Sequence, residues 1–213
     1  MRLLLVRHGQ THSNIAHALD TAYPGAELTD LGRQQAERLA ASLAAETIHV
    51  IAASTLLRAQ QTAARVAEAR GLPVMTLGAL SEIGAGDLEM RTDRDSIDAY
   101  RQVMISWATG ELDVQMPGGT GGRDFLGRYD EAIAAIEDIS QALSAGAATA
   151  LVVSHGSAIR TWVATHCDGV DALDIARSNL VNTGMFVVEG SSRSGWRLDR
   201  RIDPIEDSSP VPA

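Results

Sequence analysis

The chain has 213 residues, of which 45% are hydrophobic, 21% charged and 4% aromatic, and its formal net charge at pH 7 is −9. This length allows one sizeable hydrophobic core, while the negative charge and the scarcity of aromatic residues disfavour nucleic acids and anionic membrane surfaces as partners. A single cysteine, Cys167, excludes an intramolecular disulfide, and because no leader-like or membrane-spanning apolar run occurs either, we expect a cytoplasmic protein.

The first predicted element is a buried strand over residues 3–6, which read Leu-Leu-Leu-Val. Arg7, His8 and Gly9 fall where this strand ends, and open α/β sheets bind their ligands outside the carboxyl ends of the strands. A guanidinium, an imidazole and the start of a following helix all suit a phosphate. These residues therefore indicate an anion site.

Strand and helix patterns then alternate along the chain. Apolar runs predict further strands over residues 49–53, 73–77, 149–153, 185–188 and 196–202. Apolar residues at helical spacing predict helices over residues 13–19, 30–43, 54–63, 93–107, 124–143 and 158–165. Gly146 is expected to terminate the long helix at 124–143.

A glycine-rich stretch interrupts this alternation at about residues 80–122, and we interpret it as an insertion that covers the site as a lid. The fold class that follows is a three-layer α/β/α architecture with a mostly parallel central sheet and a lid-like insertion. One domain would span residues 1–202. Residues 203–213, which are rich in Pro, Ser and acidic residues, would form a disordered tail.

Two further strand ends carry residues suited to the same chemistry. Arg58 lies in the first turns of the helix after the strand at 49–53, where a cation opposes the helix dipole and so favours a functional role. His155 and Gly156 follow the strand at 149–153 and repeat the order seen after the first strand, an apolar run, His, Gly and a helix. The carboxyl ends of parallel strands meet at one edge of a sheet, so we expect these residues to converge.

Arg7-His8-Gly9, followed by Thr11 and Asn14, resembles the signature of the histidine phosphatase superfamily, the phosphoglycerate mutase-like enzymes. The stretch at 54–58 and the second His-Gly pair at 155–156 are similar to two further motifs of this family. The resemblance covers the chain from about residue 3 to residue 183. The resemblance implies a phosphohistidine at His8.

The resemblance also implies roles for the other site residues, and the chemistry of phosphoryl transfer agrees with them. An imidazole beside guanidinium groups is biased toward its neutral form, which can attack phosphorus, so His8 is the expected nucleophile. His155 would stabilise the transferring group together with Arg7 and Arg58. The expected substrate-binding set consists of Arg7, Gly9, Asn14, Arg58 and Gly156.

A carboxyl group must protonate the leaving oxygen and later activate water. Glu82 matches the acidic position of the family, and Asp87 and Glu89 are alternatives. The chain departs from the family here, because the family often continues with Gly, an aromatic residue and Glu-Gly, whereas residues 87–90 read Asp-Leu-Glu-Met.

The resemblance implies an enzyme, and the departures from the mutase pattern favour hydrolysis. Phosphoglycerate mutases follow their catalytic Glu with Arg and a Tyr-Gly pair, whereas residues 83–86 read Ile-Gly-Ala-Gly. We therefore predict a histidine phosphatase that hydrolyses small phosphomonoesters. The alternatives are a phosphoglycerate mutase-type phosphoryl transferase and a catalytically silent module that binds phosphorylated ligands. Arginines of the insertion region would select the leaving group, namely Arg91, Arg94, Arg101 and Arg123.

A metal hydrolase is a different class of enzyme that the histidines could suggest. His8 and His12 are four residues apart, and His17 and Asp20 follow them. However, Gly9 lies between the first two at an expected turn, and no His-Glu-x-x-His arrangement occurs. We expect no metal and no cofactor, a small phosphorylated metabolite as the partner, and the possibility of a homo-oligomer.

Overall fold

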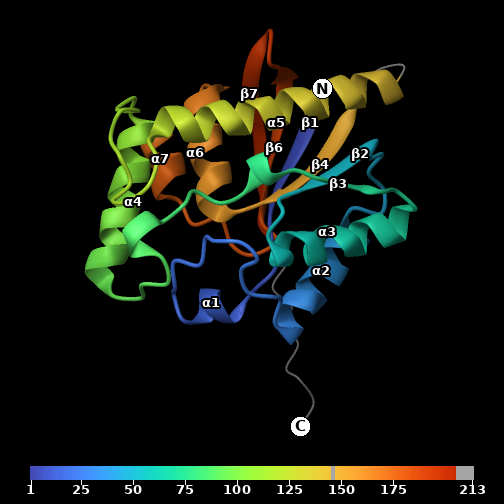
Figure 1. Ribbon diagram of the computed structural model, residues 1–213. Helices are drawn as coiled ribbons and strands as arrows, with labels where there is room; N and C mark the ends of the chain where they lie inside the picture. The colour runs from blue at the N-terminus through green and yellow to red at the C-terminus, as the bar shows by residue number, and fades with distance from the viewer. Residues whose placement is uncertain (145–146, 205–213) are drawn as a thin grey trace.

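The computed structural model describes residues 1–144 and 147–204 (Figure 1). Its strands are β1 (Arg2–Arg7), β2 (Val50–Ala53), β3 (Val74–Thr76), β4 (Thr149–Ser154), β5 (Cys167–Asp168), β6 (Met185–Ser191) and β7 (Gly195–Ile202). Its α-helices are α1 (His12–Ile15), α2 (Asp30–Ser42), α3 (Leu57–Arg70), α4 (Arg94–Ala108), α5 (Gly122–Leu143), α6 (Gly156–His166) and α7 (Ala172–Arg177). Two 3₁₀ turns, η1 (Gly78–Leu80) and η2 (Gly86–Leu88), lie between β3 and α4.

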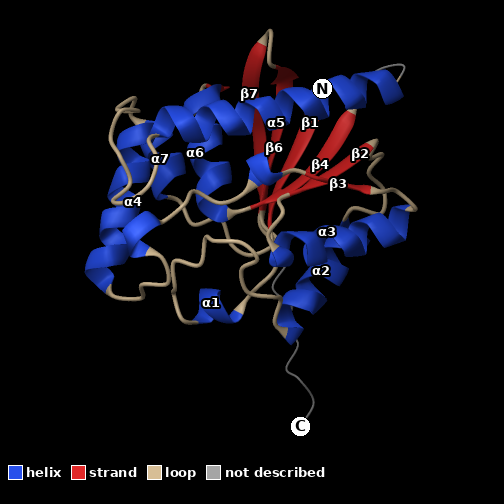
Figure 2. Ribbon diagram, viewed as in Figure 1, coloured by secondary structure: helices blue, strands red, loops and turns tan. Residues whose placement is uncertain are grey.

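All seven strands form one sheet, in the order β3-β2-β4-β1-β6-β7-β5. Neighbours pair in parallel from β3 to β1 and between β7 and β5, whereas β6 is antiparallel to both β1 and β7. The sheet is therefore mixed and mostly parallel, and the predicted α/β class is confirmed. Figure 2 shows this sheet in red with the helices around it.

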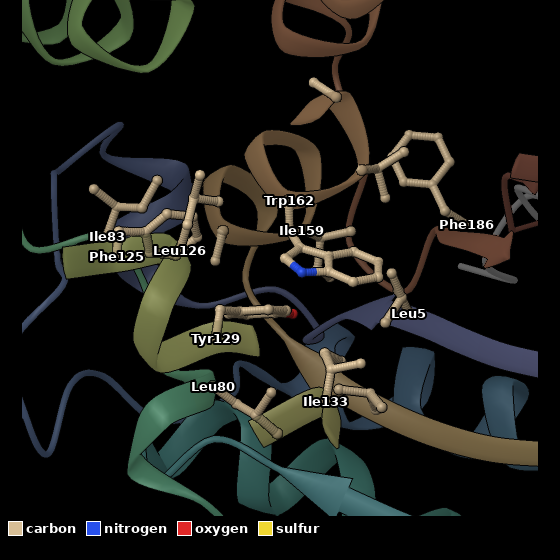
Figure 3. Packing of buried hydrophobic residues seen from close by; sticks show 14 of the residues in the cluster. Leu5, Leu80, Ile83, Phe125, Leu126, Tyr129, Ile133, Ile159, Trp162 and Phe186 are labelled. Carbon is tan, nitrogen blue, oxygen red and sulfur yellow. The ribbon is translucent and has the colours of Figure 1, made fainter. Parts of the chain in front are cut away.

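Successive residues of the central strands alternate between two hydrophobic clusters, because side chains of a strand point to opposite faces. Leu3 and Leu5 of β1 join the cluster that includes α4, α5 and α6, whereas Leu4 and Val6 join the one that includes α2 and α3. Helices thus cover both faces of the sheet, which is the predicted three-layer arrangement. In the larger cluster, Figure 3 shows Tyr129 of α5 close to Trp162 of α6.

Several predicted boundaries are wrong for local reasons. The helix expected over residues 13–19 is the short α1, which a capping box between Thr11 and Asn14 begins, and the chain leaves it at His17 with a φ of 54°. Neither β5 nor α7 was predicted, because two residues of strand and six of helix give no readable periodicity.

The insertion region, residues 80–122, contains η2, α4 and a glycine-rich loop. α4 packs against α6 and α7, beside the site at the strand ends (Figure 1). Gly146, the expected end of α5, lies outside the described residues, as do residues 205–213 of the expected tail. The single-domain boundary at residue 202 stays a prediction.

Within the described residues, Cys167 is buried and free. No helix among residues 1–144 and 147–204 is long and apolar enough to span a lipid bilayer. The cytoplasmic location and the homo-oligomer stay predictions.

Candidate active site

The register of the sheet brings three strand ends together. Arg7 at the end of β1 is opposite Ser154 at the end of β4, and Ala53 at the end of β2 is opposite Val153. Backbone hydrogen bonds continue this pairing beyond the strands, since the N–H of His8 donates to the carbonyl of Ser154 at 3.1 Å. The polar residues that follow these strands therefore lie side by side, as the sequence predicts.

His8 is buried, with 3% of its surface exposed, and its tautomer follows from its contacts. Nδ1 donates to the carbonyl of Gly9 at 2.7 Å, because a carbonyl oxygen can only accept, and this leaves a lone pair on Nε2. Nε of Arg58 donates to Nε2 at 3.0 Å. Burial lowers the pKa of His8 well below its ordinary value, and the charges of Arg58 and other neighbours lower it further. The imidazole is thus neutral, with Nε2 as its nucleophilic atom.

Two arginines flank this imidazole. Nη2 of Arg58 donates to the backbone carbonyl of Asp20 at 2.8 Å, and its Nη1 lies 3.6 Å from the Asp20 carboxylate. Nη1 of Arg7 donates to the carbonyl of Leu180 at 2.7 Å. Burial is the main reason that the pKa of Arg7 is lowered to about 10. The charge of Glu82 raises this pKa, whereas the charges of neighbouring arginines lower it further. Both guanidinium groups remain charged at neutral pH.

His155 is fully buried at the N-terminus of α6, and its ring centroid is 5.2 Å from that of His8. Nε2 of His155 is 2.8 Å from the hydroxyl of Ser54, which also accepts from the backbone N–H of Leu56. Burial and the charges of Arg58, Arg128 and Arg7 lower the pKa of His155 well below its ordinary value. The hydroxyl of Ser54 has one proton, which it can donate to Ser81 Oγ at 3.4 Å or, over the shorter distance, to Nε2 of His155; the second choice places the ring proton of His155 on Nδ1.

Three buried nitrogens at this site make no hydrogen bond within the described residues, namely Arg7 Nε, Arg58 Nη1 and His155 Nδ1. Buried polar atoms in folded proteins nearly always make a hydrogen bond, so three such nitrogens without one call for an explanation, although Arg58 Nη1 also has the Asp20 carboxylate as an ion-pair partner at 3.6 Å. All three lie on side chains that the sequence assigns to the phosphoryl clamp. An oxyanion with several acceptor oxygens fits them.

The carboxylate of Glu82 binds the N-terminus of α6. It accepts from the backbone N–H groups of Ser157 at 3.1 Å and Ala158 at 2.8 Å. Its charge also raises the pKa of Arg7, Arg58, Arg128 and Arg160, against the effect of their burial. Glu82 is therefore beside both the arginine cluster and the helix that begins after His155.

The two alternative acids have other contacts. The carboxylate of Glu89 accepts from the backbone N–H groups of Thr21 and Ala22 and from the hydroxyl of Thr21, and so ties two loops together. Asp87 is exposed and lies against Gly118 of the glycine-rich loop. Of the three candidates, only Glu82 contacts α6.

The remaining predicted residues have distinct places. The N–H of Gly9 donates to the hydroxyl of Thr62 at 3.0 Å, and a Cβ at Gly9 would lie 2.6 Å from the carbonyl oxygen of Gly32, so close packing requires this glycine. Gly156 begins α6 beside the Arg7 side chain. Oδ1 of Asn14 accepts from the N–H of Thr11 at 3.1 Å.

Sequence reasoning missed several residues around the site. Arg128 of α5 donates to the carbonyl oxygens of Ala79 and Glu82, and Arg160 of α6 donates to that of Gly156 at 3.0 Å. Asn182 contacts both His8 and Asn14. Single arginines inside amphipathic helices and an asparagine in a loop are common, so their spacing gives no signal.

The arginines expected to select the leaving group have acidic partners on the surface. Each is exposed and within 4 Å of a carboxylate, in the ion pairs Arg91–Asp93, Arg94–Asp98, Arg101–Asp98 and Arg123–Asp113. Exposed pairs of this kind contribute little to stability. The role of these arginines in selecting the leaving group stays a prediction.

The residues considered for a metal hydrolase do not gather into a ligand set. His12 and His17 are exposed, and the carboxylate of Asp20 accepts from the hydroxyl of Ser13 and the N–H of Ala26. Across the described ranges, no group of three or more His, Cys, Asp or Glu side chains is placed to hold a metal ion.

Comparisons with known proteins point to one family. The model of the histidine phosphatase superfamily (branch 1) matches residues 3–204. The PE-PGRS family protein PE_PGRS11 of Mycobacterium tuberculosis is 38% identical over 206 residues, which are 91% of this chain and 35% of that protein. The chain therefore spans about a third of the length of this relative.

Shorter relatives match over most of their length. The adenosylcobalamin/alpha-ribazole phosphatase of Salmonella typhimurium is 32% identical over 164 residues, which are 77% of this chain and 78% of the relative. The solved structure of a mycobacterial glucosyl-3-phosphoglycerate phosphatase aligns with a TM-score of 0.74 at 27% identity, covering 93% of this chain and 96% of that one. Proteins named as a phosphoglycerate mutase or a probable one are also among the relatives.

Proposed function

This chain belongs to the histidine phosphatase superfamily, branch 1, and from that premise we propose that it hydrolyses small phosphomonoesters without a metal, through a phosphohistidine at His8. The observation that carries the proposal is the set of orphaned nitrogens on Arg7, Arg58 and His155 around a neutral imidazole. Phosphoryl transfer requires positively charged groups of the protein beside the negatively charged equatorial oxygens, and a nucleophile in line with the leaving group.

In the first half-reaction, Nε2 of His8 attacks phosphorus in line with the ester oxygen. The Nε2–P bond forms as the P–O bond to the leaving group breaks, and the carboxyl group of Glu82 gives its proton to the departing oxygen. Arg58 Nε, which donates to Nε2 in the structure, turns to a phosphoryl oxygen as that lone pair engages phosphorus. Arg7 and His155 stabilise the charge on the remaining oxygens.

In the second half-reaction, water replaces the alcohol. The carboxylate of Glu82 takes a proton from the water, whose oxygen attacks phosphorus while the Nε2–P bond breaks. Inorganic phosphate leaves, and His8 returns to its neutral form. Glu82 is half-buried, so solvent reaches this carboxylate whereas His8 and His155 are covered.

For the leaving group, we propose a class rather than one compound. The alpha-ribazole phosphatase and the glucosyl-3-phosphoglycerate phosphatase described above are similar to this chain but are named for different substrates. The arginines of the insertion region pair with surface acids, which gives no support to a second anion-binding subsite of the kind a phosphoglycerate mutase uses. Hydrolysis is therefore favoured over transfer to a second phosphorylated substrate.

The first test is hydrolysis of an aryl phosphate by the purified protein in excess EDTA, with His8→Ala beside the wild type. We expect activity that survives the chelator and falls at least about 10³-fold in His8→Ala, because the nucleophile is lost. His12→Ala is the matched control, since this histidine is exposed and four residues away. Activity abolished by EDTA would contradict the metal-free mechanism.

Absence of hydrolysis in the wild type would leave a mutase, a narrowly specific phosphatase and the silent binding module as alternatives. The silent module is separated from the other two by incubating the protein with a labelled phosphoryl donor and measuring acid-labile label bound to His8. A mutase or a narrowly specific phosphatase forms the phosphohistidine, whereas a silent module does not.

A further inference from the structure

The segment of residues 180–184, which connects α7 to β6, contacts the site at several points. The N–H of Arg7 donates to the carbonyl of Gly184 at 3.0 Å, and the carbonyl of Arg7 accepts from the N–H of Thr183 at 3.0 Å. The side chain of Arg7 donates to the carbonyl of Leu180. Main chain and side chain of Arg7 are thus held by the same short segment.

Asn182 extends this support to two more site residues. Its Nδ2 donates to the carbonyl of His8 at 3.0 Å and to Oδ1 of Asn14 at 3.1 Å. An amide nitrogen has two N–H groups, so both are used. Asn182 therefore links the backbone of His8 to the side chain of Asn14.

These contacts also fix which way the amide of Asn14 faces. Oδ1 of Asn14 accepts from the N–H of Thr11 and from Nδ2 of Asn182, and both donors lie on the oxygen side of the amide. Turning the amide over would set its NH₂ group against two N–H donors. Nδ2 of Asn14 is consequently directed away from them and is available as a donor to an anion.

The backbone around Asn182 is itself constrained. Thr183 is buried and has a φ of 57°, in the left-handed region that β-branched residues rarely adopt. Such a conformation persists where surrounding contacts determine it, and here the N–H of Thr183 binds Arg7 while its hydroxyl donates to the carbonyl of Asn182 at 2.7 Å. The constrained turn directs the Asn182 side chain toward His8.

We propose that Asn182 is a positioning residue, which holds the backbone of the His8 nucleophile and orients the amide of Asn14 toward the phosphoryl group. The proposal rests on the proposed function for the identity of the anion. It assigns Asn182 no contact with substrate, so its effect on phosphate binding passes through Asn14 and its effect on turnover through His8.

A double-mutant cycle with Asn182→Ala and Asn14→Ala tests this coupling. The readouts are the Kd of inorganic phosphate, measured by calorimetry, and kcat and KM for an aryl phosphate. We expect Asn182→Ala to raise the phosphate Kd about fivefold in the wild-type background, of the order of one lost hydrogen bond. In the Asn14→Ala background, the same substitution should change Kd less than about twofold.

Asn179→Ala is the matched control, because Asn179 is exposed and three residues away in the same loop. It should leave Kd and kcat at their wild-type values. An unchanged Kd in Asn182→Ala, or the same fold-change in both backgrounds, would overturn the proposal.

A role of Asn182 in stability alone would lower the melting temperature and the active fraction without moving Kd or KM, and that outcome would also count against the proposal. Because phosphate binding is measured directly, the cycle can be read even if the wild type fails to hydrolyse the ester. The experiment therefore distinguishes a failure of the proposed phosphatase function from a failure of the positioning role proposed for Asn182.

Discussion

His8 and His155 are neutral because both imidazoles are buried among guanidinium groups, and this has a consequence for stability. Their pKa values are lowered in the folded protein, so the unfolded chain binds more protons than the folded one once the pH falls below about 6.5. Their contribution to stability is therefore complete at higher pH and is lost as the pH falls through that value.

We expect the free energy of unfolding to fall between pH 7 and pH 5, and His155→Gln to reduce this dependence by up to about 1.4 kcal/mol per pH unit. Denaturant unfolding of both proteins at several pH values measures the difference, which includes the effect of the His155 charge on the pKa of His8. Equal slopes for the two proteins would show that His155 is protonated in the folded state as readily as in the unfolded one.

Arg58 is the side chain whose removal should affect binding and turnover together. It contacts Nε2 of His8 and belongs to the proposed clamp, so Arg58→Ala is expected to lower kcat/KM at least about 100-fold and to weaken inhibition by phosphate. Arg58→Lys should recover little, because one ammonium cannot reproduce a guanidinium fork. Steady-state kinetics measure both effects, and an unchanged kcat in Arg58→Ala would show that Arg58 does not bind the phosphoryl group.

Arg65→Ala is the control on the same helix. Arg65 is exposed, and its ion pair with Glu68 is of the surface kind that contributes little. Wild-type kinetics are expected for it.

Among the site residues, those that follow strand ends and form motifs could be predicted from the sequence. His8, Arg58 and His155 are brought together because parallel strands share a carboxyl edge, and that rule needs only the order of strands and helices along the chain. Asn182 could not be found in this way. Its role comes from a loop whose path is set by tertiary contacts, in a residue type that is frequent in loops.

Two glycines control how α2 packs on the site. A Cβ at Gly32, in the first turns of α2, would lie 2.1 Å from the carbonyl oxygen of Gln10, which directly follows Gly9. That oxygen is a backbone atom, so the chain beside His8 would have to move. Gly32→Ala is expected to destabilise the protein by about 1–3 kcal/mol and to lower kcat as well.

Gly127→Ala on α5 is the matched substitution, since its Cβ would meet nothing within 4 Å. Alanine is favoured over glycine inside a helix, so this variant should be more stable by about 0.5–1 kcal/mol. Chemical denaturation of both variants tests the pair. A Gly32→Ala protein as stable as the wild type would mean that α2 can shift at no cost.

The elements that could be predicted well are those with a long periodic pattern. The helical pattern over residues 124–143 predicted α5 to within two residues at its start, and the apolar run over 149–153 predicted β4. α1 is shorter than the pattern predicts because the chain turns at His17, whose φ of 54° lies outside the right-handed helical region. A strand as short as β5 forms because it pairs with β7, and its own two residues give no pattern that predicts it.

For the whole molecule, the alternation of strands and helices was enough to predict a layered α/β fold. It was not enough to place β6 and β7 in the sheet, because their sequences have the pattern of strands without any sign of which edge of the sheet they extend. The charge of the whole chain likewise gave only part of the answer. The net charge of −9 is a sum over all residues and does not show that four arginines gather at the site.

The position of β1 in the sheet has a consequence for how this protein is made. Its neighbours are β4 and β6, and the pairing of Leu3 with Ala150 joins the start of the chain to a segment that the ribosome produces much later. Until then, the apolar strand that precedes Arg7 and His8 has no sheet partner and exposes its leucines, which makes it a site for chaperone binding or aggregation. His8 is therefore synthesised well before the strands that complete its surroundings.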